Sequence, residues 1–165
     1  MYRLVEHADV DFTVNVKDTR ALAPQVEFIE PPLKQLVINL YRAGGKDSFT
    51  SIAAIRNFDY NGSRQELVGE HYKFIDLPTA ESALQFFLKG RSDALISYQS
   101  NVKHLQKYNA LMFADNVTIT PIRRVNAYFG IAKGSEHFEL LKQVFTDYAE
   151  QNDLKYFVQV MAEAE

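Results

Sequence analysis

The sequence of 165 residues contains no cysteine. Disulfide bonds, cysteine-based zinc sites and thiol catalysis are therefore excluded, while the redox compartment stays open. The four histidines show no metal-ligand spacing, and surface positions explain them more simply. The G-x-S-x-G nucleophile elbow, the Walker loop and the G-x-G-x-x-G dinucleotide loop are also missing. We therefore expect no metal, no cofactor and no catalytic activity.

Runs of positive charge and long apolar stretches are missing as well. The formal net charge is -3, and no cluster of lysine or arginine forms a basic stripe, so nucleic acid is not an expected partner. No apolar stretch is long enough to span a membrane, and the opening MYRLVEHADVD lacks the apolar core of a signal peptide. As written, the sequence predicts a soluble protein without an export leader.

What is present is typical of a folded protein. Hydrophobic residues make up 47% of the chain and charged residues 24%, and the 12 phenylalanines and 9 tyrosines argue against disorder. The length suits one domain, or two small lobes that share strands.

The hydrophobic pattern predicts an α/β protein. Alternation from Val10 to Val16 indicates a half-buried strand, and the apolar run from Leu36 to Tyr41 indicates a strand covered on both faces. Strands and helices then alternate, as in parallel βαβ units. The predicted strands are 53–58, 72–75 and 93–98, and the predicted helices begin at Arg64, after Thr79 and at Val102.

Specific residues set the limits of these helices. Ser63 and Glu66 form an S-x-x-E capping box, and Thr79 caps a helix that Gly90 closes. Towards the end of the chain, two extended runs, 117–122 and 125–132, are split at two consecutive arginines. We expect two further helices there, one capped by Ser135 and one capped by Asn152.

Four segments resemble the type 2 periplasmic solute-binding proteins, in particular their amino-acid-binding branch. The most specific is FFLKGRSDAL, which resembles the family signature L-x-x-G-R-x-D-A. The others, in the family's order and at plausible spacing, are ADVDFTVNVKDTRALAPQVEFIEPP, AIRNFDYNGSRQEL and FGIAKGSEHFELLKQVFTDYAE.

The resemblance implies a type 2 periplasmic-binding-protein-like fold with two lobes. Residues 1–35 and 123–165 would form the first lobe, and residues 36–122 a second lobe with a parallel sheet. Because the chain begins after the strand and helix that open the family's first lobe, we expect that lobe to be truncated. Its uncovered apolar faces, on the 10–16 strand and the C-terminal helices, predict a homo-oligomer.

The resemblance also implies a ligand site. Arg20 matches the arginine that clamps the ligand's carboxylate, with Asn15 as a further contact. From spacing alone, a solvated turn residue is the better explanation of Arg20, and the resemblance makes the two interpretations equal. Ser63 and Arg64 match the helix start that opens the second half of the site, although Ser63 needs no ligand in order to cap. Tyr98 stands where the family commonly has an aspartate for the ligand's ammonium group, or else fills a gap in the core.

These features predict reversible, non-catalytic binding of a small anionic solute in a cleft between the lobes, with hinge closure. By resemblance, the partner is a membrane transporter and the location is the periplasm, while the missing leader suits the cytoplasm. A sensor or effector domain, a dehydrating enzyme, and a binding-dead remnant that serves as an interaction module stay open as alternatives. We find no poised acid and base for the enzyme, and fold alone does not decide among the others.

Overall fold

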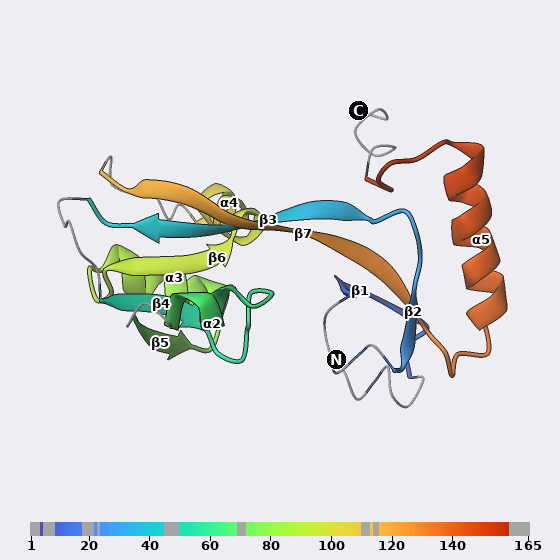
Figure 1. Ribbon diagram of the computed structural model, residues 1–165, viewed down its shortest axis with the longest axis horizontal. Helices are drawn as coiled ribbons and strands as arrows, with labels where there is room; N and C mark the ends of the chain where they lie inside the picture. Colours follow the sequence, from blue (N-terminus) through green and yellow to red (C-terminus); the bar gives the residue numbers. More distant parts are fainter. Residues whose placement is uncertain are drawn as a thin grey trace. The chain divides into compact units, whose positions relative to one another are not determined.

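The computed structural model describes residues 4, 9–17, 22, 24–44, 50–68, 72–109, 113 and 116–158. The chain divides into two compact units. Unit 1 contains residues 1–35 and 126–165, and unit 2 contains residues 36–125. Strands β3 (Lys34–Arg42) and β7 (Thr118–Ala132) carry the chain from one unit into the other (Figure 1).

Unit 2 is built on a mixed sheet in the order β7-β3-β6-β4-β5. Strand β4 (Ser51–Ile55) runs parallel to both β5 (Lys73–Leu77) and β6 (Ala94–Tyr98), whereas β3 is antiparallel to β6. Helix α2 (Ser63–Val68) follows β4, α3 (Ala80–Leu88) follows β5, and α4 (Gln99–Asn109) follows β6. The predicted βαβ alternation is confirmed in this unit, with an added antiparallel strand.

Helix α3 shows how local sequence sets an element. Thr79 Oγ1 accepts a hydrogen bond from Ser82 N at 3.1 Å, and Ser82 Oγ accepts one from Thr79 N at 3.0 Å. Gly90, with a φ of +67°, ends the helix and donates from its N–H to Phe87 O at 2.8 Å. Both predicted limits are confirmed.

The buried face of α3 forms the core of unit 2 together with strand residues on the sheet. Leu84 is fully buried there, and burial of a leucine side chain contributes about 2 kcal/mol to stability. The buried members of this core are Tyr41, Ala53, Ala83, Leu84, Phe87, Leu95, Val102 and Leu105.

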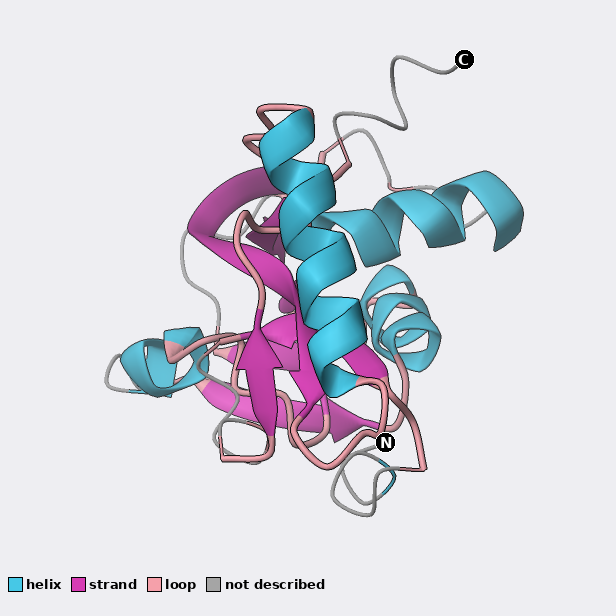
Figure 2. Ribbon diagram, turned by 90° about the vertical axis from the view of Figure 1, so that its right-hand side faces the viewer, coloured by secondary structure: helices cyan, strands magenta, loops and turns pink. Residues whose placement is uncertain are grey.

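In the part of unit 1 that the structure describes, a long helix covers a smaller sheet. Strands β1 (Phe12–Val16) and β2 (Val26–Phe28) both pair antiparallel with the last part of β7. Helix α5 (Phe138–Gln151) lies across these strands (Figure 2). The rings of Phe129 on β7 and Phe145 on α5 stack with centroids 4.6 Å apart. Among the described residues of the two units, no helix is long and apolar enough to cross a membrane.

Two predictions near the end of the chain are wrong. The extended runs 117–122 and 125–132 form one strand, β7, which continues through both arginines and pairs with β3, β1 and β2. No helix follows Asn152 in the described part of the chain, where residues 152–158 form turns. Asn152 instead ends α5 and donates from Nδ2 to Tyr148 O at 2.8 Å.

The segment after α5 still buries the residues that the pattern placed inward. Phe157 is buried in the core of unit 1, and Leu154 packs against that core. The N–H groups of Phe157 and Val158 donate to the carbonyls of Pro32 and Leu33, so the backbone bonds of this segment are long-range rather than helical. Burial alone therefore did not specify a helix.

Ser135 also differs from its prediction. Helix α5 begins three residues later, and its N-cap, His137, makes no side-chain capping bond. Ser135 Oγ accepts a hydrogen bond from His137 N at 3.0 Å and donates to Asp11 Oδ1 at 2.7 Å. The serine therefore fastens the start of α5 to the chain just before β1.

Candidate functional site

The strongest candidate site lies at one edge of the sheet in unit 2. Strands β4, β5 and β6 are parallel, so their carboxyl ends, at Ile55, Leu77 and Tyr98, share that edge. Ligands of open α/β sheets bind outside the carboxyl ends of the strands. The turn after β4 and the start of α2 add polar and aromatic side chains there.

The turn from β4 into α2 has an unusual backbone. Asn57, Tyr60, Asn61 and Gly62 have φ values of 64°, 53°, 56° and 84°, in the left-handed region. Left-handed backbone is rare for a bulky residue such as a tyrosine and marks stored strain, which is frequent at functional sites. The Asp59 carboxylate holds the turn by accepting a hydrogen bond from Gly62 N at 2.7 Å.

Tyr60 fixes this turn to the end of β4. The ring is 1% exposed, and its hydroxyl oxygen accepts a hydrogen bond from Ile55 N at 2.8 Å. Burial raises the pKa of Tyr60 to about 12, so the phenol stays neutral at physiological pH. The sequence identified Tyr60 only as a turn residue, because its partner is a backbone group that no side-chain pattern reveals.

Ser63 begins α2 but does not cap it. The predicted capping box is wrong: Ser63 Oγ has no hydrogen-bond partner among the described residues, and Glu66 pairs with Arg123 instead. Ser63 is only 2% exposed. A buried hydroxyl without a partner is uncommon and costs free energy in the folded state. The box is not formed because α2 begins at Ser63 itself, so Glu66 N donates to Gly62 O at 3.2 Å rather than to the serine hydroxyl.

Arg64 connects the ends of β4 and β5. Its Nη2 donates to Asp76 Oδ1 at 2.6 Å and to Ile55 O at 3.3 Å, and its guanidinium lies 4.6 Å from the ring centroid of Phe74. The hydrogen bond from Arg64 lowers the pKa of Asp76 below its usual value, so this pair stays ionised. Arg64 Nε is buried without a hydrogen-bond partner among the described residues.

Tyr98 ends β6 at the same edge. Its ring centroid lies 5.9 Å from that of Tyr60, and its main chain is paired opposite Ile38 on β3. The side chain is half-buried, so it both packs in the edge and reaches its surface. Asp76, next to the carboxyl end of β5, is paired with Arg64.

The other two predicted site residues are not part of this edge. Arg20 lies outside the described residues. Asn15 belongs to β1 in unit 1, where its Oδ1 accepts a hydrogen bond from Val16 N at 2.9 Å. Ser63, Arg64 and Tyr98 are therefore brought together in unit 2, with Tyr60 as an addition.

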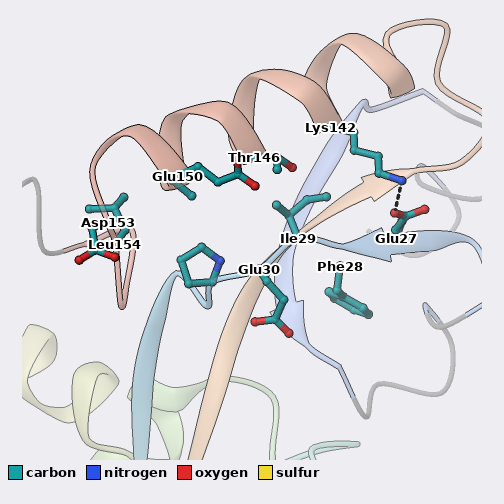
Figure 3. A pocket seen from close by; sticks show the side chains of 11 residues that line it. Glu27, Phe28, Ile29, Glu30, Lys142, Thr146, Glu150, Asp153 and Leu154 are labelled. Carbon is teal, nitrogen blue, oxygen red and sulfur yellow. Dashed lines mark ion pairs between the residues drawn. The ribbon is translucent and has the colours of Figure 1, made fainter.

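An open groove of about 530 Å³ lies in unit 1 between β2 and α5 (Figure 3). Glu27 and Glu30 line one side, and Glu150 and Asp153 the other. Lys142 donates to Glu27 at 2.7 Å, and that carboxylate raises the pKa of Lys142. The excess of carboxylates disfavours an anion here, so the groove is not a second anion site. Among the residues that the structure describes, no group of three His, Asp or Glu side chains is placed to hold a metal ion.

No protein-family model and no curated protein sequence matches this chain. Solved structures do. The GluR0 ligand-binding core from Nostoc punctiforme, crystallised with L-glutamate, aligns with a TM-score of 0.63 and 12% identity over 91% of this chain and 72% of its own.

Two further structures agree with that match. The periplasmic VFT2 domain of Bordetella pertussis BvgS aligns with a TM-score of 0.68 and 14% identity, over 98% of this chain and 70% of its own. The ancestral amino-acid-binding protein AncCDT-1, a precursor of cyclohexadienyl dehydratase, aligns with a TM-score of 0.67 and 15% identity, over 98% and 72%. The expected fold is confirmed: the chain has the mixed α/β fold of periplasmic-binding-protein-like domains.

Proposed function

We propose that this chain reversibly binds a small solute that carries a carboxylate, at the edge of unit 2 formed by Tyr60, Ser63, Arg64 and Tyr98. The main support for this proposal is that two buried donors, Ser63 Oγ and Arg64 Nε, have no hydrogen-bond acceptor among the described residues. The fold supports solute binding in general, because its neighbours include binding proteins for amino acids.

A carboxylate would satisfy both donors at once. Hydrogen bonds to a charged group contribute about 1.5–3 kcal/mol each, and binding would also remove the cost of the unmade bonds. Both atoms are closed to solvent, so a ligand can reach them only after a local movement, which we assign to the 57–62 turn. Three non-glycine residues of that turn, Asn57, Tyr60 and Asn61, have left-handed backbone, and this strain makes a movement less costly than in relaxed backbone.

Tyr98 and Asp76 decide which carboxylates fit best. A neutral phenol at position 98 supplies no charge for a ligand ammonium group. Asp76 already neutralises Arg64. We therefore propose that simple organic acids bind more tightly than zwitterionic amino acids, with Arg20 as a further anchor for the carboxylate.

Calorimetry with both classes of ligand tests the proposal. Ser63→Ala should weaken binding of organic acids by about tenfold or more, the loss of one charge-assisted bond. Ser92→Ala is the matched control, because Ser92 is 4% exposed and its Oγ is also without a partner among the described residues, but it precedes β6 at the opposite end of the strand. Equal binding by wild type and Ser63→Ala would contradict the site.

Arg20→Ala extends the same experiment. If Arg20 holds the carboxylate, its truncation should cost on the order of 2–5 kcal/mol of binding free energy. Tight binding of amino acids that is insensitive to Arg20→Ala and to Ser63→Ala would place the ligand elsewhere. Binding of neither ligand class would favour the remnant that serves as an interaction module.

The finer assignments from the sequence stay proposals as well. They are a first lobe of residues 1–35 and 123–165, a second lobe of residues 36–122, a membrane transporter as partner, and a periplasmic location. The sensor or effector domain is the runner-up, since it would use the same site and the same class of ligand.

A further inference from the structure

Strand β1 presents an unpaired edge within the described part of unit 1. It stands at the end of the sheet order and pairs with β7 alone. Ala132 N donates to Asp11 O, so Asp11 is a residue of β1's side of the ladder whose backbone groups point towards β7, and every second residue after it does the same. By that alternation, residues 13 and 15 face β7, while the N–H and C=O groups of Phe12, Val14 and Val16 point away from it. Val16 N is already bound by Asn15 Oδ1, so the outward groups of Phe12 and Val14 form the open part of the edge.

The same strand carries exposed apolar side chains. Phe12 is 48% exposed and Val14 41%, although both side chains lie on the side of the sheet that α5 covers, where the Phe12 ring approaches Phe145 at 6.2 Å. Natural sheets usually protect their edges with lysine, proline or bulges. Between its first and last residues β1 has none of these, and the segment FTVNV is uncharged.

Helix α5 extends this apolar surface. Leu140, Val144 and Tyr148 are 62%, 53% and 43% exposed and recur every four residues, so they form one stripe along the helix. Lys142 and Thr146 face the groove on the β2 side of α5. The stripe is turned away from that groove, towards β1. We call the five exposed residues together the β1–α5 face; contiguous apolar surface of this kind marks a site of association.

We propose that the β1–α5 face binds a second copy of this chain, with the two β1 strands antiparallel and Val14 on the two-fold axis. In this register Val14 pairs with Val14 of the second copy, and Phe12 pairs with its Val16. The three outward-pointing residues of β1 are symmetric about Val14, and of their backbone groups only Val16 N, which Asn15 Oδ1 already binds, would not be free to pair.

Charge complementarity favours a second copy over another partner. The register that centres on Val14 places Asp11 opposite Lys17 of the second copy, and the reverse pair forms on the other side of the axis. Opposite charges across a pair of strands are stabilising, whereas like charges are destabilising. Within one copy Asp11 Oδ1 accepts a hydrogen bond from Ser135 Oγ and Lys17 pairs with Glu30, so the contacts across the axis would share these two charges with their present partners. The strand is therefore complementary to itself in charge as well as in backbone bonds.

A closed dimer follows from this symmetry. Once the two β1 strands pair, neither copy has an open β1 edge left for a third copy. The assembly therefore stops at two copies instead of growing into a fibre. The sheet becomes continuous through the axis, and the stripes of the two α5 helices face the same interface. Leu140, Val144 and Tyr148 would then be covered together with Phe12 and Val14.

Sedimentation equilibrium of the full chain, over a range of micromolar concentrations, tests the dimer. The wild type should be dimeric. Val14→Lys places two ammonium groups face to face on the axis and should raise the dimer dissociation constant by about tenfold or more. Ile119→Lys is the matched control, since Ile119 is 50% exposed but lies in unit 2. A wild type that is monomeric throughout would overturn the proposal, as would a dimer that Val14→Lys leaves unchanged.

A charge swap checks the register. Asp11→Lys and Lys17→Asp should each weaken the dimer by bringing like charges together, and the double variant should restore it. Restoration separates contact between copies from damage within one chain, because the double variant still lacks the original bonds to Ser135 and Glu30. Circular dichroism of each variant verifies folding. A double variant as weak as the single variants would overturn the Val14-centred register.

Discussion

In unit 2 the central strands β4 and β6 are buried along nearly their whole length, whereas in unit 1 strand β1 alternates between buried and exposed residues. The helices differ in the same way. Helix α3 buries Ala83, Leu84 and Phe87, while α5 has only Ala149 fully buried. Unit 2 therefore buries β4, β6 and α3 more completely than unit 1 buries β1 and α5. For that reason the two units should respond differently to the same kind of substitution.

The largest expected difference concerns the cores. Leu84→Ala should destabilise unit 2 by about 2–5 kcal/mol, because Leu84 is fully buried and its neighbours cannot fill the space. Leu141→Ala, at a half-buried position on α5, should cost clearly less. Urea unfolding followed by circular dichroism gives both free energies of unfolding. Equal losses of unfolding free energy for the two variants would mean that the two units do not differ in how tightly their apolar side chains are packed.

A smaller effect sharpens the comparison within unit 2. Thr79→Ala should cost about 1 kcal/mol, because the capping bonds of α3 are formed. Ser63→Ala should leave the free energy of unfolding unchanged or raise it, since its buried hydroxyl makes no bond among the described residues. Chemical denaturation of the two variants measures the contrast. A loss for Ser63→Ala as large as that for Thr79→Ala would mean that a cap does form.

The smallest effect depends on pH. Arg64 lowers the pKa of Asp76 from its ordinary value of 3.8 in the unfolded chain. Stability from this pair is therefore fully present above the unfolded pKa and is lost as pH falls through the lower, folded one. The Asp76 side chain is 41% exposed, so the contribution should stay below about 1 kcal/mol.

Asp76→Asn tests that contribution. The difference in free energy of unfolding between wild type and variant should be constant near neutral pH and shrink below pH 3.8. A difference that does not change in acid would show that the Arg64 contact acts through geometry rather than through charge.

The sequence predicted those elements whose signals are local. Thr79, Ser82 and Gly90 lie within one helix and its ends, so pattern and structure agree there. The predicted capping box failed because Ser63 lies inside α2, where Glu66 N donates to Gly62 O, while the Glu66 side chain pairs with Arg123, far along the chain. The prediction for the segment after Asn152 failed because its backbone bonds go to Pro32 and Leu33.

In the candidate site, too, some residues were predicted from the sequence and others were not. Ser63, Arg64 and Tyr98 were predicted because their segments resemble the type 2 periplasmic solute-binding proteins, and the structure brings them to one edge because parallel strands end there. The partner of Arg64, Asp76, and the role of Tyr60 were missed. Each depends on the register of neighbouring strands or on a bond to main chain, which a single sequence does not display.

The order in which the units occur along the chain has a consequence for synthesis. Unit 2 is one continuous stretch, residues 36–125, so it can fold as soon as that stretch has left the ribosome. Unit 1 cannot, because β1 and β2 must wait for β7, whose pairing residues are translated more than a hundred positions later. Closing so long a loop is slow unless something shortens it. A folded unit 2 does so by fixing the distance between its two ends. Until β7 has been synthesised, the uncharged FTVNV segment of β1 has no strand to pair with and is open to non-native strand pairing.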